Sequence, residues 1–393
     1  MRNKALFVIY SMNIGGAQKS LISFLSIVDR EQCDIDLLVL DGKGELIHNV
    51  PNNVNVIKKR EYVSLFSNDL KTVLSHFSFK GLFLRIVWFA LKNKYKKDSK
   101  TFYSFCQKKW QFFLKKRLTP FKTKYDYAIA YMQSFPTYFV MDKVCANKKV
   151  LWLHNDYSKL NADTNIDFEY YKSSDINITI SDYCKDIFNS FFPSLCDKTD
   201  VIPNFTIEKT LIELSNKYYP SEFSNNALKI LSIGRLENQK GFDLAIEAAS
   251  ILKKKIKFVW IILGEGSLKK DLKEQIKKNG LEKTVLLLGT RKNPYVYIKN
   301  CDLFVQSSRY EGKSIVLDEA KTLNKIIIST NYTTVTEQIT DKKNGYICDI
   351  DPNDIAQKIL EVSRADNFTV REYLKKETEK HIDYQIYLAK VFN

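Results

Sequence analysis

The sequence predicts an α/β protein with two domains, each built on a parallel sheet that helices cover on both faces. Its 393 residues exceed one ordinary core, since a domain usually takes roughly 100–200 residues. Short apolar runs alternate with helical patterns along most of the chain. These runs are apolar throughout, which is typical of strands that are buried on both faces of a parallel sheet.

The predicted strands form two series that are separated near residues 201–210. The first series comprises 4–10, 34–40, 125–132, 148–154 and 175–181, and the second comprises 228–234, 257–264, 283–289, 301–308 and 324–330. A helix is predicted over 241–253, where alanines and a leucine recur on one face. We expect a Rossmann-like N-terminal domain over 1–205, a Rossmann-like C-terminal domain over 206–375, and a C-terminal helix in 376–393 that packs back on the first domain. Ligands of such sheets bind beyond the carboxyl ends of the strands, so the site is expected in a cleft where the two sheets face each other.

Composition limits the partners and the compartment. The net charge of +16, from 61 Lys and Arg against 45 Asp and Glu, favours an anionic partner. The seven cysteines form no C-x-x-C pair, so neither a disulfide framework nor a zinc site is indicated and a reducing compartment is expected. The first residues suggest a buried strand and a glycine-rich turn rather than a signal peptide. No apolar run reaches the ~20 residues of a membrane-spanning helix.

Two loops that follow predicted strands carry groups suited to an anion. In "NIGGAQKS" (13–20), Gly15 and Gly16 permit a tight turn before a helix whose first amides are free, although a plain strand-to-helix turn explains the pair as well. In "GRLENQKG" (234–241), Arg235 and Lys240 lie between a strand and a helix. The planar guanidinium of an arginine and the point charge of a lysine suit a diphosphate. The alternative is a solvated surface pair, but the position at the end of a strand favours binding of a ligand.

His154, in "WLHNDY", is the histidine with the most suggestive position, since it ends a predicted strand. A lone histidine is more often structural than catalytic, but a strand end facing the expected cleft favours a functional role. No pair of histidines has a metal-ligand spacing. The two D-x-D patterns, at 34–36 and 349–351, precede a strand and a proline turn and are interpreted as structural.

The stretch "RYEGKSIVLDEA" (309–320) places Glu311 and Glu319 on either side of a glycine and a new helix. The helix is predicted to begin near Ser314, so the amides of Ser314–Val316 could hold phosphate oxygens. Carboxylates beside bound phosphates repel them and would instead accept hydrogen bonds from neutral hydroxyls. The spacing therefore suits a nucleotide sugar, with one carboxylate on the sugar and the other on the ribose.

Together these motifs resemble the retaining family 4 glycosyltransferases of the GT-B fold. The resemblance is carried by E-x7-E after "CDLFVQSS", by "SIGRLENQKGFDLAIEA" upstream, by "GGAQKS" and "WLHND", and by "LGEGSLKKDLKEQI", "LLGTRKNPYVYIKNCDLF" and "NGYICDIDPNDIAQKI" in the same order. It covers nearly the whole chain and is weakest over about 55–125. It implies a bacterial enzyme of capsular or other surface polysaccharide synthesis, with a nucleoside diphosphate sugar as donor, UDP being expected.

The resemblance also implies roles for individual residues. Arg235 and Lys240 would bind the donor diphosphate, Glu311 the donor sugar, Glu319 the ribose, and the Thr290–Arg291 loop the base. Gly16 would lie near the phosphates, and His154 near the sugar and acceptor. The catalytic residues expected are His154, Glu311, Arg235 and Lys240, and the donor-binding residues expected are Gly16, Gly234, Arg235, Lys240, Thr290, Arg291, Glu311, Gly312, Lys313, Ser314, Ile315, Val316 and Glu319. No metal and no cofactor is expected, because cations and helix amides would stabilise the leaving group.

The chain departs from the family pattern in three places. Lys313 and Ser314 stand where an apolar residue and Pro are common, "NYTTVTEQ" replaces a glycine pair after "IIST", and "VIPNF" lacks the usual glycine. These departures affect the expected sugar and phosphate contacts more than the expected class.

A basic, aromatic insert spans about 60–125. Residues 80–124 carry 14 Lys and Arg against one acid, Asp98. Around 102–118, six apolar residues (Phe102, Phe105, Cys106, Trp110, Phe113 and Leu114) recur at helical spacing. We interpret the insert as amphipathic helices for an anionic membrane surface, with Trp88 and Trp110 inserted. The alternative is that the apolar stripes pack on the domain's own core; nucleic acid is not expected, because no RNA or DNA module accompanies the charge.

The sequence thus predicts a cytoplasmic enzyme, peripheral at the inner face of a bacterial membrane, that transfers a sugar to a lipid-linked or glycan acceptor. A sugar-nucleotide epimerase is the nearest enzymatic alternative, since it can share the fold but needs neither a lipid acceptor nor a basic insert. An inactive GT-B subunit that partners an active enzyme is the non-enzymatic alternative, which the presence of Glu311, Glu319, Arg235 and Lys240 disfavours.

Overall fold

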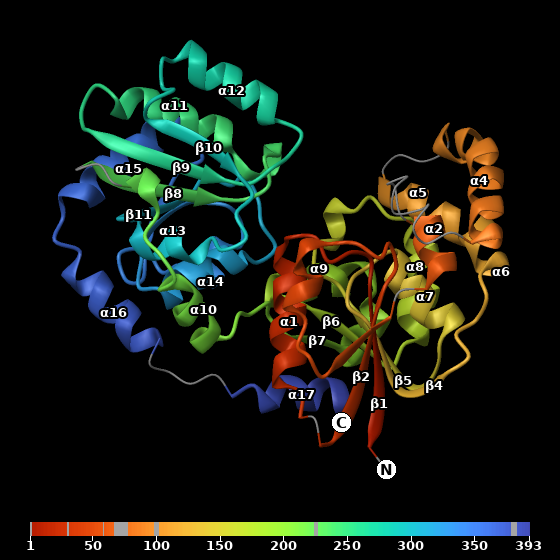
Figure 1. The fold of residues 1–393 in the computed structure, drawn as a ribbon. Helices are drawn as coiled ribbons and strands as arrows, with labels where there is room; N and C mark the ends of the chain where they lie inside the picture. Colours follow the sequence, from red (N-terminus) through yellow and green to blue (C-terminus); the bar gives the residue numbers. More distant parts are fainter. Residues whose placement is uncertain are drawn as a thin grey trace. The chain divides into compact units, whose positions relative to one another are not determined.

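The computed structural model describes residues 2–29, 31–57, 59–66, 78–97, 102–223, 227–378 and 383–393. The chain divides into two compact units, one formed by Met1–Phe205 with Asp383–Asn393 and the other by Thr206–Ile382. Each unit holds one parallel sheet with helices on both faces (Figure 1). The predicted α/β class with two parallel sheets is confirmed. None of the helices in the described part of the chain has the length and hydrophobicity needed to span a bilayer.

The N-terminal unit is built on a seven-stranded sheet in the order β3-β2-β1-β4-β5-β6-β7. Its strands are β1 (Asn3–Ile9), β2 (Cys33–Val39), β3 (Val54–Ile57), β4 (Lys124–Ala130), β5 (Cys145–Trp152), β6 (Ile176–Thr179) and β7 (Thr199–Val201). Its main helices are α1 (Gly16–Ile27), α7 (Phe135–Lys143), α8 (Thr164–Ser173), α9 (Asp182–Phe191) and α17 (Gln385–Phe392).

Successive side chains of β1 point to opposite faces of this sheet, as the pleat of a strand requires. Phe7 packs in a core with α1 and α17, whereas Val8 packs in a core with α7 and α8. The C-terminal helix is fixed by Val391, which is fully buried, and by the Tyr127 hydroxyl, which donates to the Phe392 carbonyl at 2.7 Å. This last segment starts at Asp383 and its helix at Gln385, later than the expected start at 376, because α16 (Phe368–Thr378) still belongs to the other unit.

The insert between β3 and β4 is helical. It comprises α2 (Arg60–Phe66), α4 (Phe79–Lys97), α5 (Phe102–Lys109), a π-helical segment (Trp110–Leu114) and α6 (Lys115–Arg117). The side chain of Trp88, predicted to insert into a membrane, lies outside the described residues, as does that of Phe102. Trp110 is fully buried, so its predicted insertion into a membrane is wrong.

The C-terminal unit is built on a six-stranded sheet in the order β10-β9-β8-β11-β12-β13. Its strands are β8 (Leu228–Ile233), β9 (Phe258–Leu263), β10 (Val285–Gly289), β11 (Leu303–Gln306), β12 (Ile326–Thr330) and β13 (Tyr346–Cys348). Helices α11 (Phe242–Leu252), α12 (Lys269–Lys278) and α15 (Pro352–Arg364) cover one face, and α10 (Glu208–Ser215), α13 (Tyr295–Asn300) and α14 (Ile315–Thr322) cover the other (Figure 1). Because β8 and β11 are parallel neighbours, the loops that follow them lie together at the carboxyl ends of these strands.

Candidate active site

Two glycines shape the loop that joins β8 to α11. Gly241 has a φ of +61°, and a Cβ there would lie 2.0 Å from the Ser307 carbonyl oxygen, so only glycine fits. Gly234 leaves room for the stem of Lys240, since a Cβ at Gly234 would meet Lys240 Cδ at 3.0 Å. The Ser307 hydroxyl donates to the Lys240 carbonyl at 2.9 Å. These contacts hold the Lys240 loop against the end of β11.

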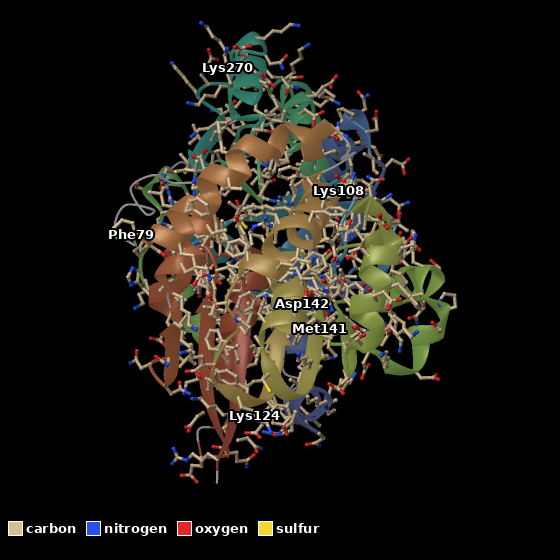
Figure 2. The ribbon with its side chains drawn as sticks, turned by 90° about the vertical axis from the view of Figure 1, so that its right-hand side faces the viewer. Phe79, Lys108, Lys124, Met141, Asp142 and Lys270 are labelled. Atoms are coloured by element: carbon tan, nitrogen blue, oxygen red, sulfur yellow. The ribbon has the colours of Figure 1, made fainter. Side chains whose placement is uncertain are left out.

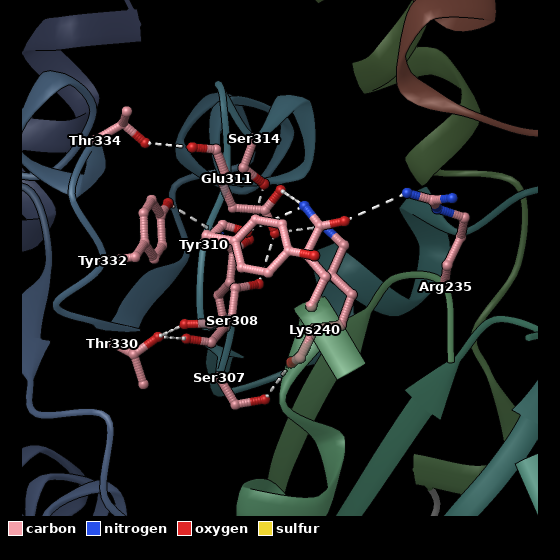
Figure 3. A network of polar contacts seen from close by, with 12 residues as sticks. Arg235, Lys240, Ser307, Ser308, Tyr310, Glu311, Ser314, Thr330, Tyr332 and Thr334 are labelled. Atoms are coloured by element: carbon pink, nitrogen blue, oxygen red, sulfur yellow. Dashed lines mark hydrogen bonds and ion pairs between the residues drawn. The ribbon is translucent and has the colours of Figure 1, made fainter. Parts of the chain in front are cut away.

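Lys240 and Glu311 form an ion pair beyond the carboxyl ends of β8 and β11 (Figure 3). Lys240 Nζ lies 2.6 Å from Glu311 Oε1, and their side chains are 15% and 7% exposed. The Ser308 hydroxyl donates to the same carboxylate oxygen at 2.6 Å, and Gln239 Nε2 donates to Glu311 Oε2 at 3.3 Å. Arg235 is exposed, and its Nη2 donates to Gln239 Oε1 at 3.3 Å. The structure therefore gathers three predicted residues, Arg235, Lys240 and Glu311, around Gln239.

The loop that follows β11 is held by side-chain hydrogen bonds from Thr330 and Thr334 and by an ion pair with Asp243 (Figure 3). The Thr330 hydroxyl donates to the Ser308 carbonyl at 2.6 Å, and the Thr334 hydroxyl donates to the Glu311 carbonyl at 2.9 Å. Arg309 forms two hydrogen bonds with the Asp243 carboxylate, at 2.8 and 2.6 Å. This bidentate pair raises the pKa of Arg309 and lowers that of Asp243, although burial of Asp243 opposes the latter shift. Glu311 is thus presented on a fixed backbone.

Helix α14 begins at Ile315, in agreement with the predicted start near Ser314, which is the N-cap residue but makes no capping hydrogen bond with its side chain. The Ser314 amide donates to Gln338 Oε1 at 2.8 Å, so this amide is occupied and does not face an anion as predicted. Its hydroxyl donates to Gln306 Oε1 at 2.8 Å. The serine that replaces the expected Pro is therefore bound within a polar network, and the amides of Ile315 and Val316 are the remaining candidates for a phosphate. Gly312 and Lys313 lie on the half-buried loop before this helix.

Glu319 lies in α14 and is 1% exposed. Its Oε1 accepts hydrogen bonds from the Tyr295 hydroxyl at 3.1 Å and from the Thr206 hydroxyl at 3.4 Å. Glu319 is thus surrounded by hydroxyl donors, whereas Glu311 is bound to a cation.

Thr290 and Arg291 follow β10. Thr290 is exposed, and Arg291 Nε donates to the Tyr297 hydroxyl at 3.3 Å while its Nη2 lies 3.7 Å from Glu222 Oε1. The hydrogen bond to Tyr297 is the main cause that raises the pKa of Arg291. The loop predicted to meet the base is therefore fixed by Glu222 and Tyr297.

In the N-terminal unit, Gly16 is the first residue of α1, and no side chain caps that helix. His154 follows β5 and is 9% exposed, stacked on Trp152 with ring centroids 6.0 Å apart and an interplanar angle of 7°. Burial lowers the pKa of His154 to about 3, an effect that the nearby Asn204 side chain and Tyr131 carbonyl oppose. The imidazole is therefore neutral at pH 7.

Neither ring nitrogen of His154 meets hydrogen-bond geometry with a group of the described residues, and neither does Asn204 Oδ1. Buried polar groups are normally paired, because an unmade hydrogen bond costs about 1–3 kcal/mol. A hydroxyl or water that reaches these atoms would satisfy them. His154 and Asn204 thus form a polar pair suited to a small hydroxyl-bearing ligand.

Three residues of these sites were not predicted from the sequence. Gln239 lies between Arg235 and Lys240 in the loop motif, so its position in the sequence could have indicated a place in the site. Asn204 lies three residues beyond β7, a strand that the prediction omitted. Tyr295 is separated from Glu319 by 24 residues, and nothing in the local pattern joins them.

The C-terminal site contains two cations, Arg235 and Lys240. It also contains two carboxylates: Glu311 is paired with Lys240, and Glu319 accepts hydrogen bonds from hydroxyls. Within the described residues no three His, Cys, Asp or Glu side chains gather as metal ligands would. The D-x-D patterns are structural, as predicted: Asp36 accepts hydrogen bonds from Asn55 and Tyr125, and Asp351 caps α15.

Most of the C-terminal unit matches a known protein family. Residues 219–381 match the family described as glycosyl transferases group 1. This segment of the C-terminal unit is therefore similar to group 1 glycosyltransferases. The loops that carry Arg235, Lys240, Glu311 and Glu319 all lie within the matched residues.

Curated relatives match part of the chain. An uncharacterised glycosyltransferase of Methanocaldococcus jannaschii is 36% identical over 50% of this chain and 52% of its own length. The N-acetylgalactosamine-N,N'-diacetylbacillosaminyl-diphospho-undecaprenol 4-alpha-N-acetylgalactosaminyltransferase of Campylobacter jejuni is 36% identical over 39% of this chain and 44% of its own. The matched segments thus span about half the length of these relatives.

Solved structures match both units. HepE of Anabaena, in complex with UDP and glucose, has a TM-score of 0.70 and 18% identity, with 99% of each chain covered. A variant of TarM from S. aureus, in complex with Fondaparinux, alpha-GlcNAc-glycerol and UDP, has a TM-score of 0.69 and 17% identity, with 100% of each chain covered. At these identities the likeness shows the fold, which is the GT-B fold predicted from the motifs.

Proposed function

We propose that this chain is a retaining glycosyltransferase of bacterial polysaccharide biosynthesis. It moves a sugar from a UDP-sugar, a UDP-hexose or a UDP-N-acetylhexosamine, to a lipid-linked or cell-surface glycan acceptor. The observation that carries the proposal is the Lys240–Glu311 pair, with Arg235 beside it, at the carboxyl ends of β8 and β11, within the residues that match group 1 glycosyltransferases.

Arg235 and Lys240 bind the donor diphosphate. A lysine ammonium has three donors and Glu311 occupies one, so Lys240 can hold a phosphate oxygen while it stays paired. Negative charge grows on the departing UDP as the bond between the sugar C1 and the phosphate oxygen breaks. Fixed cations that strengthen their contacts at that moment lower the barrier.

Glu311 accepts a hydroxyl of the donor sugar. An ionised carboxylate has about four acceptor positions, and Lys240, Ser308 and Gln239 occupy three. The remaining position suits one sugar hydroxyl. Glu319 binds the ribose in the same manner, since its surroundings are already hydroxyl donors.

Retention is supported by the products that relatives are named for. The C. jejuni relative is named a 4-alpha transferase, and a relative in Staphylococcus aureus is named poly(ribitol-phosphate) alpha-N-acetylglucosaminyltransferase, at 31% identity over 43% of this chain and 35% of its own length. An α-linked donor that yields an α-linked product retains its configuration. In the proposed step the acceptor oxygen attacks C1 from the face that the phosphate leaves, and the acceptor proton passes to the leaving phosphate. Neutral His154 would accept or donate a hydrogen bond near the sugar and acceptor without carrying charge.

The same names support the proposed acceptor class. One relative is named for a diphospho-undecaprenol substrate and another for poly(ribitol-phosphate). A lipid-linked acceptor requires the enzyme at a membrane, and the 14 Lys and Arg of residues 80–124 suit its anionic inner face. We propose a cytoplasmic protein that is peripheral at that face and binds no nucleic acid.

The test is release of UDP from a panel of UDP-, GDP- and ADP-sugars by the purified chain, with product analysis. A transferase releases UDP and, given an acceptor, extends it; an epimerase would instead isomerise the donor without release, and an inactive subunit would do neither. Lys240→Ala should lower turnover on the order of 10²–10³-fold, while Lys270→Ala, at an exposed lysine of the same unit, should not. Activity should survive EDTA, because the two cations replace a metal. Equal turnover of wild type and Lys240→Ala at saturating donor would refute the assignment.

A further inference from the structure

We propose that α4 is the lipid-facing helix of the basic insert, and that its exposed stripe of Phe79, Phe83, Ile86 and Phe89 enters the interface of an anionic bilayer. The inference rests on the proposed membrane role of residues 80–124. It does not depend on the identity of the donor or on the stereochemistry of the reaction.

The stripe is unusually exposed for apolar side chains. Phe79, Phe83, Ile86 and Phe89 are 84%, 65%, 61% and 67% exposed. At 3.6 residues per turn, these positions follow one face of the helix. The opposite face is held by the domain, since Leu84 is 5% exposed and Val87 packs against the same core. The helix is thus fixed to the unit by one face and presents apolar side chains on the other.

The apolar stripe predicted over 102–118 is instead buried. Cys106, Trp110, Phe113 and Leu114 are at most 2% exposed and belong to the core that α7 and α8 share. Trp110 Nε1 also donates to Asp142 Oδ2 at 2.7 Å. For this stripe the alternative of packing on the domain's own core is correct. Phe112 of this segment is 61% exposed.

The charge around α4 identifies the partner as an anionic surface. Phe79–Lys97 contains six Lys and Arg and no acid. Lys80 has a counter-ion within the unit, Glu61 at 3.0 Å. Figure 2 faces the side of the chain that carries α4, with Phe79 labelled at its start. Basic residues that flank an exposed aromatic stripe are the pattern of a helix lying in a bilayer interface, where headgroups meet the charge and acyl chains meet the rings.

The experiment measures binding to vesicles of phosphatidylcholine with phosphatidylglycerol and to vesicles of phosphatidylcholine alone. The test variant is Phe79→Ser with Phe83→Ser and Phe89→Ser. The matched control is Phe368→Ser with Tyr218→Ser and Tyr219→Ser, three aromatics of the other unit that are 63%, 50% and 51% exposed. Wild type and control should pellet with the anionic vesicles, and the test variant should partition at least about tenfold more weakly, because three rings no longer leave water.

Salt separates the two parts of the contact. In 1 M salt the Debye length falls to about 3 Å, so the charge contribution is lost and the wild type should keep a residual binding that the test variant lacks. Equal binding of wild type and test variant to anionic vesicles would overturn the proposal for α4. Equal binding of wild type to neutral vesicles, or binding only to acidic protein or nucleic acid, would overturn the choice of an anionic bilayer.

A second variant guards against misfolding. Phe83→Trp keeps the stripe apolar, and its fluorescence in excess of wild type should be quenched by brominated anionic lipids; no excess quenching would contradict insertion. Titration with UDP should give the same affinity for wild type and all variants. Failure of vesicle binding with UDP binding intact would remove the membrane proposal and leave the transferase proposal standing.

Discussion

Glu311 and Glu319 have different environments, and this difference leads to a prediction for each. Glu311 is paired with Lys240, whereas Glu319 accepts hydrogen bonds from the hydroxyls of Tyr295 and Thr206. Glu319→Gln should weaken binding of free UDP about 10- to 100-fold, the value of a hydrogen bond to a charged group. Glu311→Gln should leave UDP affinity unchanged or raise it, because Lys240 loses its counter-ion, while turnover falls.

Calorimetric titration with UDP, which lacks the sugar, measures the first effect, and steady-state turnover with UDP-sugar measures the second. Glu274→Gln, at an exposed carboxylate on α12, is the matched control. The division of roles fails if Glu311→Gln weakens UDP binding as much as Glu319→Gln does.

His154 should make the stability of the N-terminal unit depend on pH. Its pKa is about 3 in the folded chain because of burial, and about 6.5 when unfolded. The unfolded state therefore binds the proton more readily. Stability is complete above pH 6.5 and is lost as the pH falls towards 3, by about 1.4 kcal/mol per pH unit.

Urea unfolding of wild type and His154→Gln at pH 7 and pH 5 provides the measurement. Wild type should lose about 2 kcal/mol more than the variant over this interval. His48→Gln, at an exposed histidine of the same unit, serves as control. Parallel pH profiles for wild type and His154→Gln would show that folding leaves the pKa of the imidazole unchanged.

At the residue scale the sequence placed Lys240 and Glu311 at strand ends but did not bring them together. They are 71 residues apart, and they meet because β8 and β11 are neighbours in the sheet. Strand order depends on packing between elements, which local patterns do not report. The same reason explains the occupied Ser314 amide: its partner, Gln338, is 24 residues away.

At the scale of elements, the ten predicted strands are present and three strands were omitted. The omitted strands are β3, β7 and β13, and each lies at an edge of its sheet. These three strands are three or four residues long, whereas the fourth edge strand, β10, has five residues and was predicted. A short strand with a solvated side lacks the continuous apolar run that identifies a strand buried on both faces.

Helix periodicity in the insert had a related limit. A repeat of 3.6 residues identifies an apolar face but not what covers it. The stripe with Trp110 is buried in the domain's own core, whereas the side chains of the stripe with Phe79 are exposed. Lysines accompany both stripes in the sequence, so composition could not separate the two.

A buried carboxylate anchors the insert, which gives a prediction at this scale. Asp167 of α8 is fully buried and accepts hydrogen bonds from the hydroxyls of Tyr103, Tyr138 and Tyr157 at 3.1, 2.7 and 2.9 Å. Of these, only Tyr103 belongs to the insert. Tyr103→Phe should destabilise the docking of α5 by about 1.5–3 kcal/mol, since it removes one bond to a charged or polar carboxyl group.

Hydrogen exchange followed by mass spectrometry is the measurement. Amides of α5 and the segment to Arg117 should exchange faster in Tyr103→Phe, and those of the C-terminal unit should not change. Tyr218→Phe, at a half-exposed tyrosine, is the control. Burial raises the pKa of Asp167, so its cost is least at low pH and grows as the pH rises through that pKa. The wild-type exchange rates in α5 should therefore rise with pH more than intrinsic exchange does, and absence of both effects would contradict the anchor.

At the scale of the whole molecule, each unit has its own pair of cores. Those of the N-terminal unit draw on β1–β7 with α17, and those of the C-terminal unit draw on β8–β13. The sequence predicted this division because two series of apolar runs are separated by a polar stretch. It could not predict where the last helix would begin, because the helical pattern continues through α16 into the final segment.

The separate cores predict that UDP stabilises one unit only. Arg235, Lys240 and Glu319 all belong to Thr206–Ile382. A ligand at 100 times its Kd adds about 2.7 kcal/mol to the folded state that binds it, which for a unit of this size raises Tm by roughly 5–10 °C. Pulse proteolysis during heating, with peptides assigned to each unit, should show this shift for the C-terminal unit and none for the N-terminal unit. Lys240→Ala should reduce the shift at the same UDP concentration. Equal protection of both units would mean that their cores unfold as one, and protection of the N-terminal unit alone would place the nucleotide on the wrong unit.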